Sequence, residues 1–231
     1  AAGSLRKHET LARASDSSIV TSVATRISAE DKLYSRNLTG AAAVGGAAVG
    51  GGFALTLSNA RVAAELNGGS SQSASLDINA RASTLAGHDD AVEVEAYAGG
   101  AGFGVGLGAA LAIGQMRNDI SSRISGAHTS TGAINLNASD LLNLDIDALG
   151  ASAGAAAVGI VVASGVRDSN VKVLVADNAQ LTGNAVNLSA RGEGGINVYG
   201  LAAAGGLAVA GTGVASIAIE RTKVETDLKV R

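Results

Sequence analysis

The chain of 231 residues contains no cysteine, no proline and no tryptophan, and aromatic residues make up only 2% of it. Without cysteine it can form neither disulfide bonds nor thiolate metal sites, and it has no cysteine nucleophile. Without proline nothing interrupts a β-ladder, because proline removes a backbone donor and is confined to strand edges and bulges. The net charge of −3 is too small to indicate nucleic acid as a partner, and we expect none.

Hydrophobic residues nevertheless make up 47% of the chain, and 32 residues are glycine. This apolar content predicts a folded core, not a disordered chain. The first fifteen residues are polar and charged and do not have the apolar centre of a signal peptide. Because the sequence lacks an initiating methionine and stops directly after a strand-like run, we expect it to be a piece of a longer protein.

Four Gly/Ala-rich stretches, 40–57, 96–113, 148–166 and 199–219, are about as long as a membrane-spanning helix. Their residues alternate in twos, however, as in AGFGVGLGAALAIGQ (101–115), where every second residue from Phe103 to Ile113 is larger than its Gly or Ala neighbours, apart from Ala109. A period of two predicts a strand. We expect the Phe103–Ile113 face to fill a wide core and the Gly/Ala face to admit another backbone. No membrane insertion is expected, and a membrane-inserted Gly-rich protein is an alternative.

The chain is built from internal repeats. The run [LIV]-x-[LI]-x-A occurs as LDINA (76–80), INLNA (134–138) and VNLSA (186–190), with a degraded copy expected near TLARAS (10–15). Each run follows a turn-like polar cluster and precedes an alternating run, a Gly/Ala stretch and a further strand-like run. The last of these, anchored on Val62, Ile120, Val171 and Val224, recurs at spacings of 58, 51 and 53 residues.

These spacings divide the chain into one array of four repeats: 1–66, 67–124, 125–175 and 176–231. The first repeat is the irregular one, with SAEDKLYSRN (28–37) interpreted as an insertion. Repeated strands without helical patterns predict an all-β parallel solenoid (β-helix) of Gly/Ala-rich repeats a little over fifty residues long. An antiparallel Gly/Ala-rich β-sandwich or roll is the alternative.

Two segments, GAAAVGGAAVGGGFALTLSNARVAAEL (40–66) and YGLAAAGGLAVAGTGVASIAIERTKVETDL (199–228), resemble the repeats of large bacterial surface exoproteins. These include filamentous haemagglutinin-like proteins and leukotoxin-type filamentous adhesins. The resemblance covers the chain from about Ser18 onward and consists of repeat texture. It implies a rod-like segment that is secreted or displayed at the bacterial cell surface, exported by a type V-like or related route. No functional residue can be transferred from the resemblance.

We expect no catalytic, cofactor-binding or metal-binding constellation among the polar side chains. His88 with Asp89 and Asp90 is interpreted as a solvated turn, as is His128 in GAHTSTG (126–132). Tyr97 and Tyr199 occupy similar repeat positions and are interpreted as plugs at a coil corner. The glycines of GGAGFG (99–104) lack the other parts of a phosphate-binding loop. On one exposed face we expect a polar set: Glu93, Glu95, Asn143, Asp145 and Asp147.

The sequence therefore predicts a structural, non-enzymatic rod segment of a secreted or cell-surface bacterial adhesin. We expect self-association, end to end or lateral, into filaments, together with a host or matrix receptor of unknown identity. An enzymatic alternative is a β-helix hydrolase or lyase acting on polysaccharide. Its only candidate acidic groups are Glu93, Glu95, Asp145 and Asp147.

Overall fold

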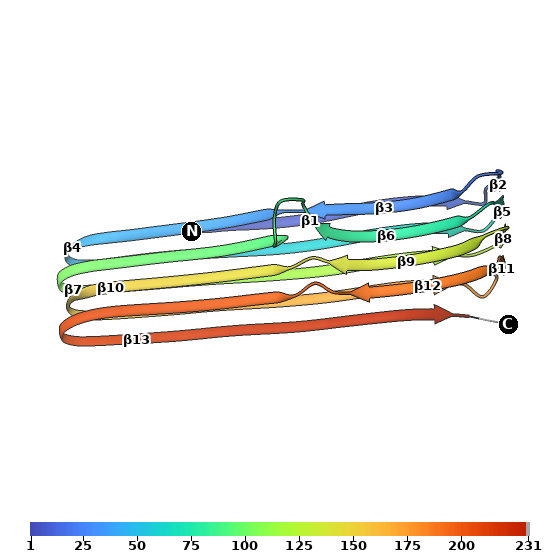
Figure 1. Ribbon diagram of the computed structural model, residues 1–231. Coiled ribbons are helices and arrows are strands. Elements are labelled where there is room, and N and C mark those ends of the chain that lie inside the picture. Colours follow the sequence, from blue (N-terminus) through green and yellow to red (C-terminus); the bar gives the residue numbers. More distant parts are fainter. Residues whose placement is uncertain (230–231) are drawn as a thin grey trace.

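The computed structural model describes residues 1–229, and within them every sheet is parallel and every strand neighbours its counterpart from the adjacent repeat (Figure 1). The last two residues of the predicted fourth repeat lie outside the described part. The first sheet contains β1 (Ala2–Ser15), β4 (Ser35–Asn67), β7 (Val92–Ile124), β10 (Leu144–Val175) and β13 (Ile196–Leu228). These parallel pairings confirm the β-solenoid and exclude the antiparallel sandwich or roll.

Two smaller sheets complete each coil. One contains β2 (Ser18–Val20), β5 (Ser70–Ser73), β8 (Ala127–Ser130) and β11 (Gln180–Thr182), and the other contains β3 (Thr25–Leu33), β6 (Leu76–Thr84), β9 (Ala133–Leu141) and β12 (Ala185–Gly192). The anchor residues of the sequence repeat are direct partners: Val62 pairs with Ile120, Ile120 with Val171, and Val171 with Val224. Among the described residues no helix is long and apolar enough to cross a membrane.

Each long strand runs out along one side of the molecule, bends, and returns along the other side, as the left end of Figure 1 shows. The bend coincides with the register shifts at Gly45/Ala47 and at Ala153/Ala156. Between the outgoing and returning halves most inward positions are glycine or alanine, and a Cβ added to Gly50, Gly52 or Gly108 would strike backbone of the opposite half. We call this thin, two-layered part the arm; it comprises 40–57, 97–115, 149–166 and 200–219, and contains no charged residue.

The remainder, which we call the base, has a wider core. Here β6 and β9 face the ends of the long strands, and the inward residues are large and fully buried, among them Ile78, Ile120, Ile134 and Leu136. The motif [LIV]-x-[LI]-x-A supplies this layer, because alternate residues of a strand point to the same face. Outside the core, amide ladders join successive coils: Asn135 Nδ2 donates to Asp77 Oδ1 at 2.7 Å, and Asn187 Nδ2 to Asn135 Oδ1 at 2.8 Å.

The orientation expected for the stretch 101–115 is wrong in one respect. Its Gly/Ala face does meet the opposite half of the arm, but the face from Phe103 to Ile113 points outward; Phe103 is 91% exposed. The reason is thickness: with backbones in near contact through glycine, the interior of the arm has no room for Phe or Leu, so the larger side chains must face away.

The expected irregularity of the first repeat is also wrong. Apart from Tyr34, residues 28–37 are regular strand, since Ser28 pairs with Asn79 and Ser35 with Val92. The extra residues belong to the second coil, in the loop 85–91 that joins β6 to β7, where the first coil has only Tyr34. The counterpart of LDINA in the first coil is TRISA (25–29), not TLARAS, which lies in β1 and pairs with residues 62–67 of β4.

Candidate functional site

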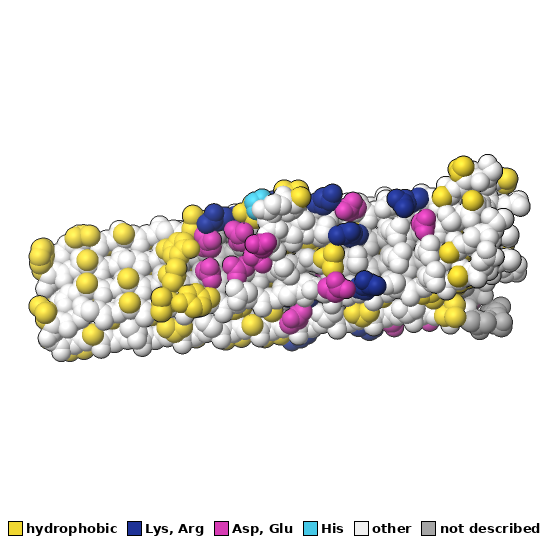
Figure 2. All heavy atoms as spheres, in the orientation of Figure 1, with side chains coloured by type: hydrophobic (Ala, Val, Ile, Leu, Met, Phe, Trp, Pro, Cys, Tyr) yellow, Lys and Arg dark blue, Asp and Glu magenta, His cyan; other side chains and the backbone are white. Residues whose placement is uncertain are grey.

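Where the outgoing half of the arm meets the base, four carboxylates form a ladder on the outer surface. Asp145 pairs in register with Glu93, and Asp147 with Glu95, so that two acidic rungs cross β7 and β10. This is the face that the sequence predicted to be polar, and Figure 2 shows the acidic group beside a row of hydrophobic side chains. We call Glu93, Glu95, Asp145 and Asp147 the acidic ladder.

One arginine partly neutralises this ladder. The Arg36 guanidinium, on β4, lies 2.9 Å from Glu95 Oε2 and 3.4 Å from Glu93 Oε2. On the other side, Asn197 Nδ2 donates to Asp145 Oδ1 at 2.6 Å. Asp147 has no such partner, and its pKa is raised by burial and by the charges of Asp145 and Glu95. The pKa of Asp90, in the neighbouring loop, is raised for the same kind of reason: burial first, then Asp145 and Glu93.

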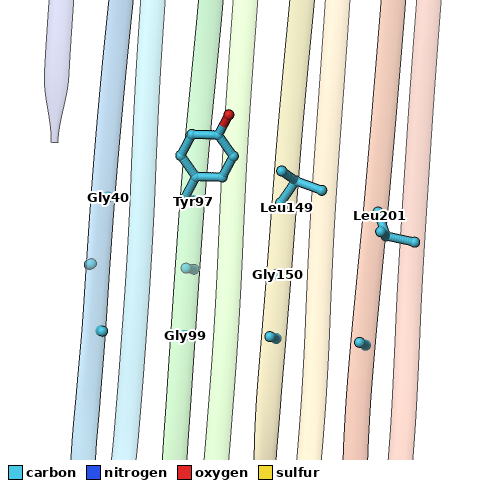
Figure 3. Close-up of a pocket in the computed structure, with 11 residues that line it drawn as sticks. Gly40, Tyr97, Gly99, Leu149, Gly150 and Leu201 are labelled. Atoms are coloured by element: carbon cyan, nitrogen blue, oxygen red, sulfur yellow. The ribbon is translucent and has the colours of Figure 1, made fainter.

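Next to the ladder lies a shallow apolar groove of about 580 Å³. Tyr97, Leu149 and Leu201 stand side by side on neighbouring strands and form one wall, with Gly40 at the same level on β4 (Figure 3). The floor consists of Gly and Ala from the next rows of the same strands. The groove therefore offers apolar contact and one phenol, and its polar neighbours are the carboxylates of the ladder.

The loop 85–91 covers the β4 side of this region. The exposed His88 ring stacks on Tyr34, with ring centroids 3.5 Å apart and planes 16° apart, and the Tyr34 hydroxyl donates to Glu93 Oε2 at 3.4 Å. His88 does lie in a turn, as expected, and Asp89 is exposed beside it. The imidazole thus packs on an aromatic ring and is not directed at the acidic ladder.

The turn expected around His128 is wrong. His128 lies in β8, is 1% exposed, and makes two hydrogen bonds. Its Nε2 lies 2.9 Å from the carbonyl oxygen of Ser125, which can only accept, so Nε2 carries the proton and Nδ1 accepts from Ser71 Oγ at 2.9 Å. Burial lowers the pKa of His128. Both nitrogens are used within the fold, which makes this histidine a structural one.

The interpretation of the two tyrosines as plugs at a coil corner is wrong. Their repeat positions are similar but not identical, since Tyr97 pairs with Leu149 and Tyr199 with Asp147, two residues earlier in β10. Both point outward from near the start of a long strand, and Tyr199 is 49% exposed. Of the glycines of 99–104, Gly102 lies at the bend at the tip of the arm, where the register shifts.

A buried ionic network in the base was not predicted from the sequence. Arg167 and Asp140, both 0% exposed, form an ion pair at 2.8 Å between β10 and β9. Asp140 Oδ2 also accepts from Asn118 and Ser169, and Arg167 donates to the carbonyl of Leu142 and to the side chains of Glu220 and Thr222. The only available signal was an arginine at an inward position of the alternating pattern, where the neighbouring coil has Met116.

In residues 1–229 no group of three or more His, Cys, Asp or Glu side chains is arranged to hold a metal ion. The acidic ladder is a flat surface of carboxylates, paired in part with Arg36, that can accept hydrogen bonds. Comparison with protein-family models, with curated proteins and with solved structures finds no match to this chain.

Proposed function

We propose that this chain is a structural, non-enzymatic rod segment of a secreted or cell-surface bacterial protein of the adhesin type. The observation that carries the proposal is the continuous parallel ladder: each coil pairs along its whole length with the next one. In such an array stability is a sum of coil and nearest-neighbour terms, so the structure can be extended without a new core.

The stiffness of the rod comes from three sources, two along its axis and one across its layers. Backbone ladders join the coils in all three sheets. Asparagine ladders connect β6, β9 and β12 on the outside. Inside the arm, glycine brings the two halves into backbone contact, so that little free volume is left. Such a segment would hold a displayed binding tip at a fixed distance from the cell surface.

The last described coil also supports end-to-end self-association. The strand β13 has one sheet neighbour, β10, and inward residues that are fully buried in the middle coils are half exposed here; Val224 is 48% exposed, whereas its partner Val171 is 0% exposed. An open edge with an open core accepts another parallel coil, from a second copy or from further chain.

The test is to place a charge in this open core. Val224→Lys keeps its ammonium in water in the single chain but puts it in the core of any coil stacked on β13, where an unpaired charge is strongly unfavourable. We expect wild type to form linear particles as concentration rises, followed by small-angle scattering and sedimentation velocity, and V224K to remain one chain long.

The matched control is Asp227→Lys, on the outward side of the same strand, which should assemble like wild type. If wild type shows no growth up to millimolar concentration, or if V224K grows as wild type does, end-to-end stacking through β13 is wrong.

A further inference from the structure

The outer surface of the returning half of the arm is a broad sheet face without charge. It is formed by alternate residues of 47–57, 105–115, 156–166 and 209–219, which stand in register on β4, β7, β10 and β13. Bulky apolar side chains dominate it, including Val49 at 68%, Ile160 at 51% and Val209 at 61% exposure. Gln115 and Ser164 are its only polar side chains. We call it the returning face.

The core of the arm does not account for these side chains. Most inward positions of the same strands are Gly and Ala, and they already meet the outgoing half through backbone: a Cβ on Gly106 or Gly108 would strike the carbonyl of Ala153 or Ala151. The alternation could not be reversed to bury the large residues, because the two halves are too close. The large residues are therefore placed where only something outside the coil can cover them.

We infer that the returning face is a lateral interface, and that its partner is the returning face of a second copy of this chain, packed sheet against sheet. Along the strands the face extends about 35 Å, and across four strands about 19 Å, or roughly 650 Å². Two copies would thus bury on the order of 1,300 Å², within the range of stable interfaces at about 1,200–2,000 Å². The rows of apolar side chains on this face have the spacing of the strands, so a second sheet with the same spacing can pack its own rows against them.

The charges disfavour insertion of the arm into a bilayer. A bilayer into which the arm inserted would surround both sides of it, yet the outgoing side carries the acidic ladder at its boundary, which anionic headgroups repel. Hydrocarbon would also have to solvate the unpaired backbone groups of the outermost strands, at a cost of several kcal/mol for each group. In a face-to-face pair those edges remain in water.

Beside the face, at the edge of the base, the next rows carry both signs of charge. Arg117 and Arg221 flank Asp168, with nitrogen–oxygen distances of 3.7 and 3.6 Å, so the three groups together carry one positive charge. These charges are paired with each other beside the face and none lies within it, so they repel a second copy only weakly. A flat, uncharged face whose border charges are paired among themselves fits a copy of itself.

The experiment uses the full chain carrying Val224→Lys, so that end-to-end stacking does not contribute. Sedimentation equilibrium should show a dimer in this background. Adding Ile160→Lys, at the centre of the returning face, should weaken the dimer a hundredfold or more, because an ammonium would be desolvated without a partner. Leu201→Lys, equally exposed at 49% but on the outgoing side, is the control and should leave the dissociation constant unchanged within about threefold.

Cross-linking by a cysteine at Val49 or Val209 identifies the surface directly. A reducible dimer bond that forms there, and not at a cysteine placed at Leu201, supports the inference. A monomer at all concentrations, or a dimer equally weakened by L201K, overturns it. Binding of the monomer to uncharged phosphatidylcholine vesicles, lost in I160K, would also overturn it and assign the face to lipid. Because stacking through β13 is tested separately, either proposal can fail without the other.

Discussion

At the scale of the residue, glycine acts here through the space it leaves and not through special backbone angles. Among the described glycines, only Gly68, Gly69, Gly87 and Gly126 have positive φ, all in loops between strands. The arm glycines are extended, and their role is to let one backbone approach another. Gly114 and Gly165 have a different neighbour, the Cδ1 of Ile146. The large Ile146 side chain of one layer occupies the space that a side chain at these glycines of the other layer would need.

A glycine substitution tests this close approach. We expect Gly108→Ala to lower stability by about 1–3 kcal/mol, because the new methyl group would meet the backbone of Ala151, which cannot move without disturbing its ladder. Gly213→Ala, which has nothing within 4 Å of the added Cβ, should leave the melting temperature unchanged or slightly higher. The readout is thermal unfolding by circular dichroism. Equal destabilisation by both changes would mean that the backbone preference of glycine, and not the close approach of the two halves of the arm, determines the effect.

At the scale of the element, the Arg167–Asp140 ion pair connects β9, in the sheet of β3, β6, β9 and β12, to the long strand β10. Asp140 is the inward residue near the end of β9, and Arg167 reaches it from β10 at the point where the arm widens into the base. Each ion has several hydrogen-bond partners, which is the condition under which burial of charge is tolerated. The widening of the core is thus filled by a polar network where one coil has methionine.

Breaking this pair from one side should be costly. We expect Arg167→Met, which installs the residue of the neighbouring coil, to destabilise the protein by about 3–5 kcal/mol, since Asp140 is left charged and buried. The double variant Arg167→Met, Asp140→Asn should recover a large part of that loss, because the amide is neutral and still accepts from Asn118 and Ser169. Denaturant unfolding compares the two. A double variant no more stable than the single one would show that the guanidinium contacts, and not charge balance, dominate.

At the scale of the whole molecule, the long dimension of the chain is not the solenoid axis. From the tip of the arm to the far end of the base each strand path extends about 65–70 Å, whereas the coils stack at about 4.8 Å each. In Figure 1 the strand paths run across the view and the coils are stacked from top to bottom. A rod built from such coils is a ribbon whose width is the strand length. Charge is divided along that width: the arm has none, and the base and the boundary have all of it.

We expect the acidic ladder to contribute to the pH dependence of the folding stability. The pKa of Asp147 is higher in the folded chain than its ordinary value, so the folded state binds the proton more tightly and gains stability as pH falls through that window. Asp147→Asn should therefore raise the melting temperature at pH 7, by on the order of 1 °C since the group is partly exposed to water, and the difference should shrink toward pH 4.

His128 acts in the opposite direction. Its pKa is lowered by burial, so the stability that its neutral form provides is present above about pH 6.5 and is lost as pH falls below that value. The comparison of Asp147→Asn with wild type is therefore made at each pH, where the His128 contribution is common to both and cancels. Asp227→Asn, outside the ladder, is the control. A difference between D147N and wild type that grows toward acid pH would contradict the assigned direction.

The sequence by itself determined the solenoid, because a period of two fixes strands and a repeat a little over fifty residues long can satisfy its ladders by pairing with itself. Val62, Ile120 and Val171 were correctly placed as equivalent for that reason. Which side of a strand faces inward was not determined where both sides are apolar: at 101–115 hydrophobicity favours burial of Phe103 and Leu111, and only the distance between the two halves of the arm turns them outward.

Pairing across layers was likewise decided by the tertiary structure alone. Arg167 and Asp140 are 27 residues apart in the chain, and nothing in their neighbours indicates that they meet; the packing of β9 against the long strand β10 brings them together. The same holds for Arg36 with Glu93 and Glu95, and for His128 with Ser71. Local pattern fixes what each strand is, whereas the contacts between strands of different layers depend on where the coil bends and how thick it is.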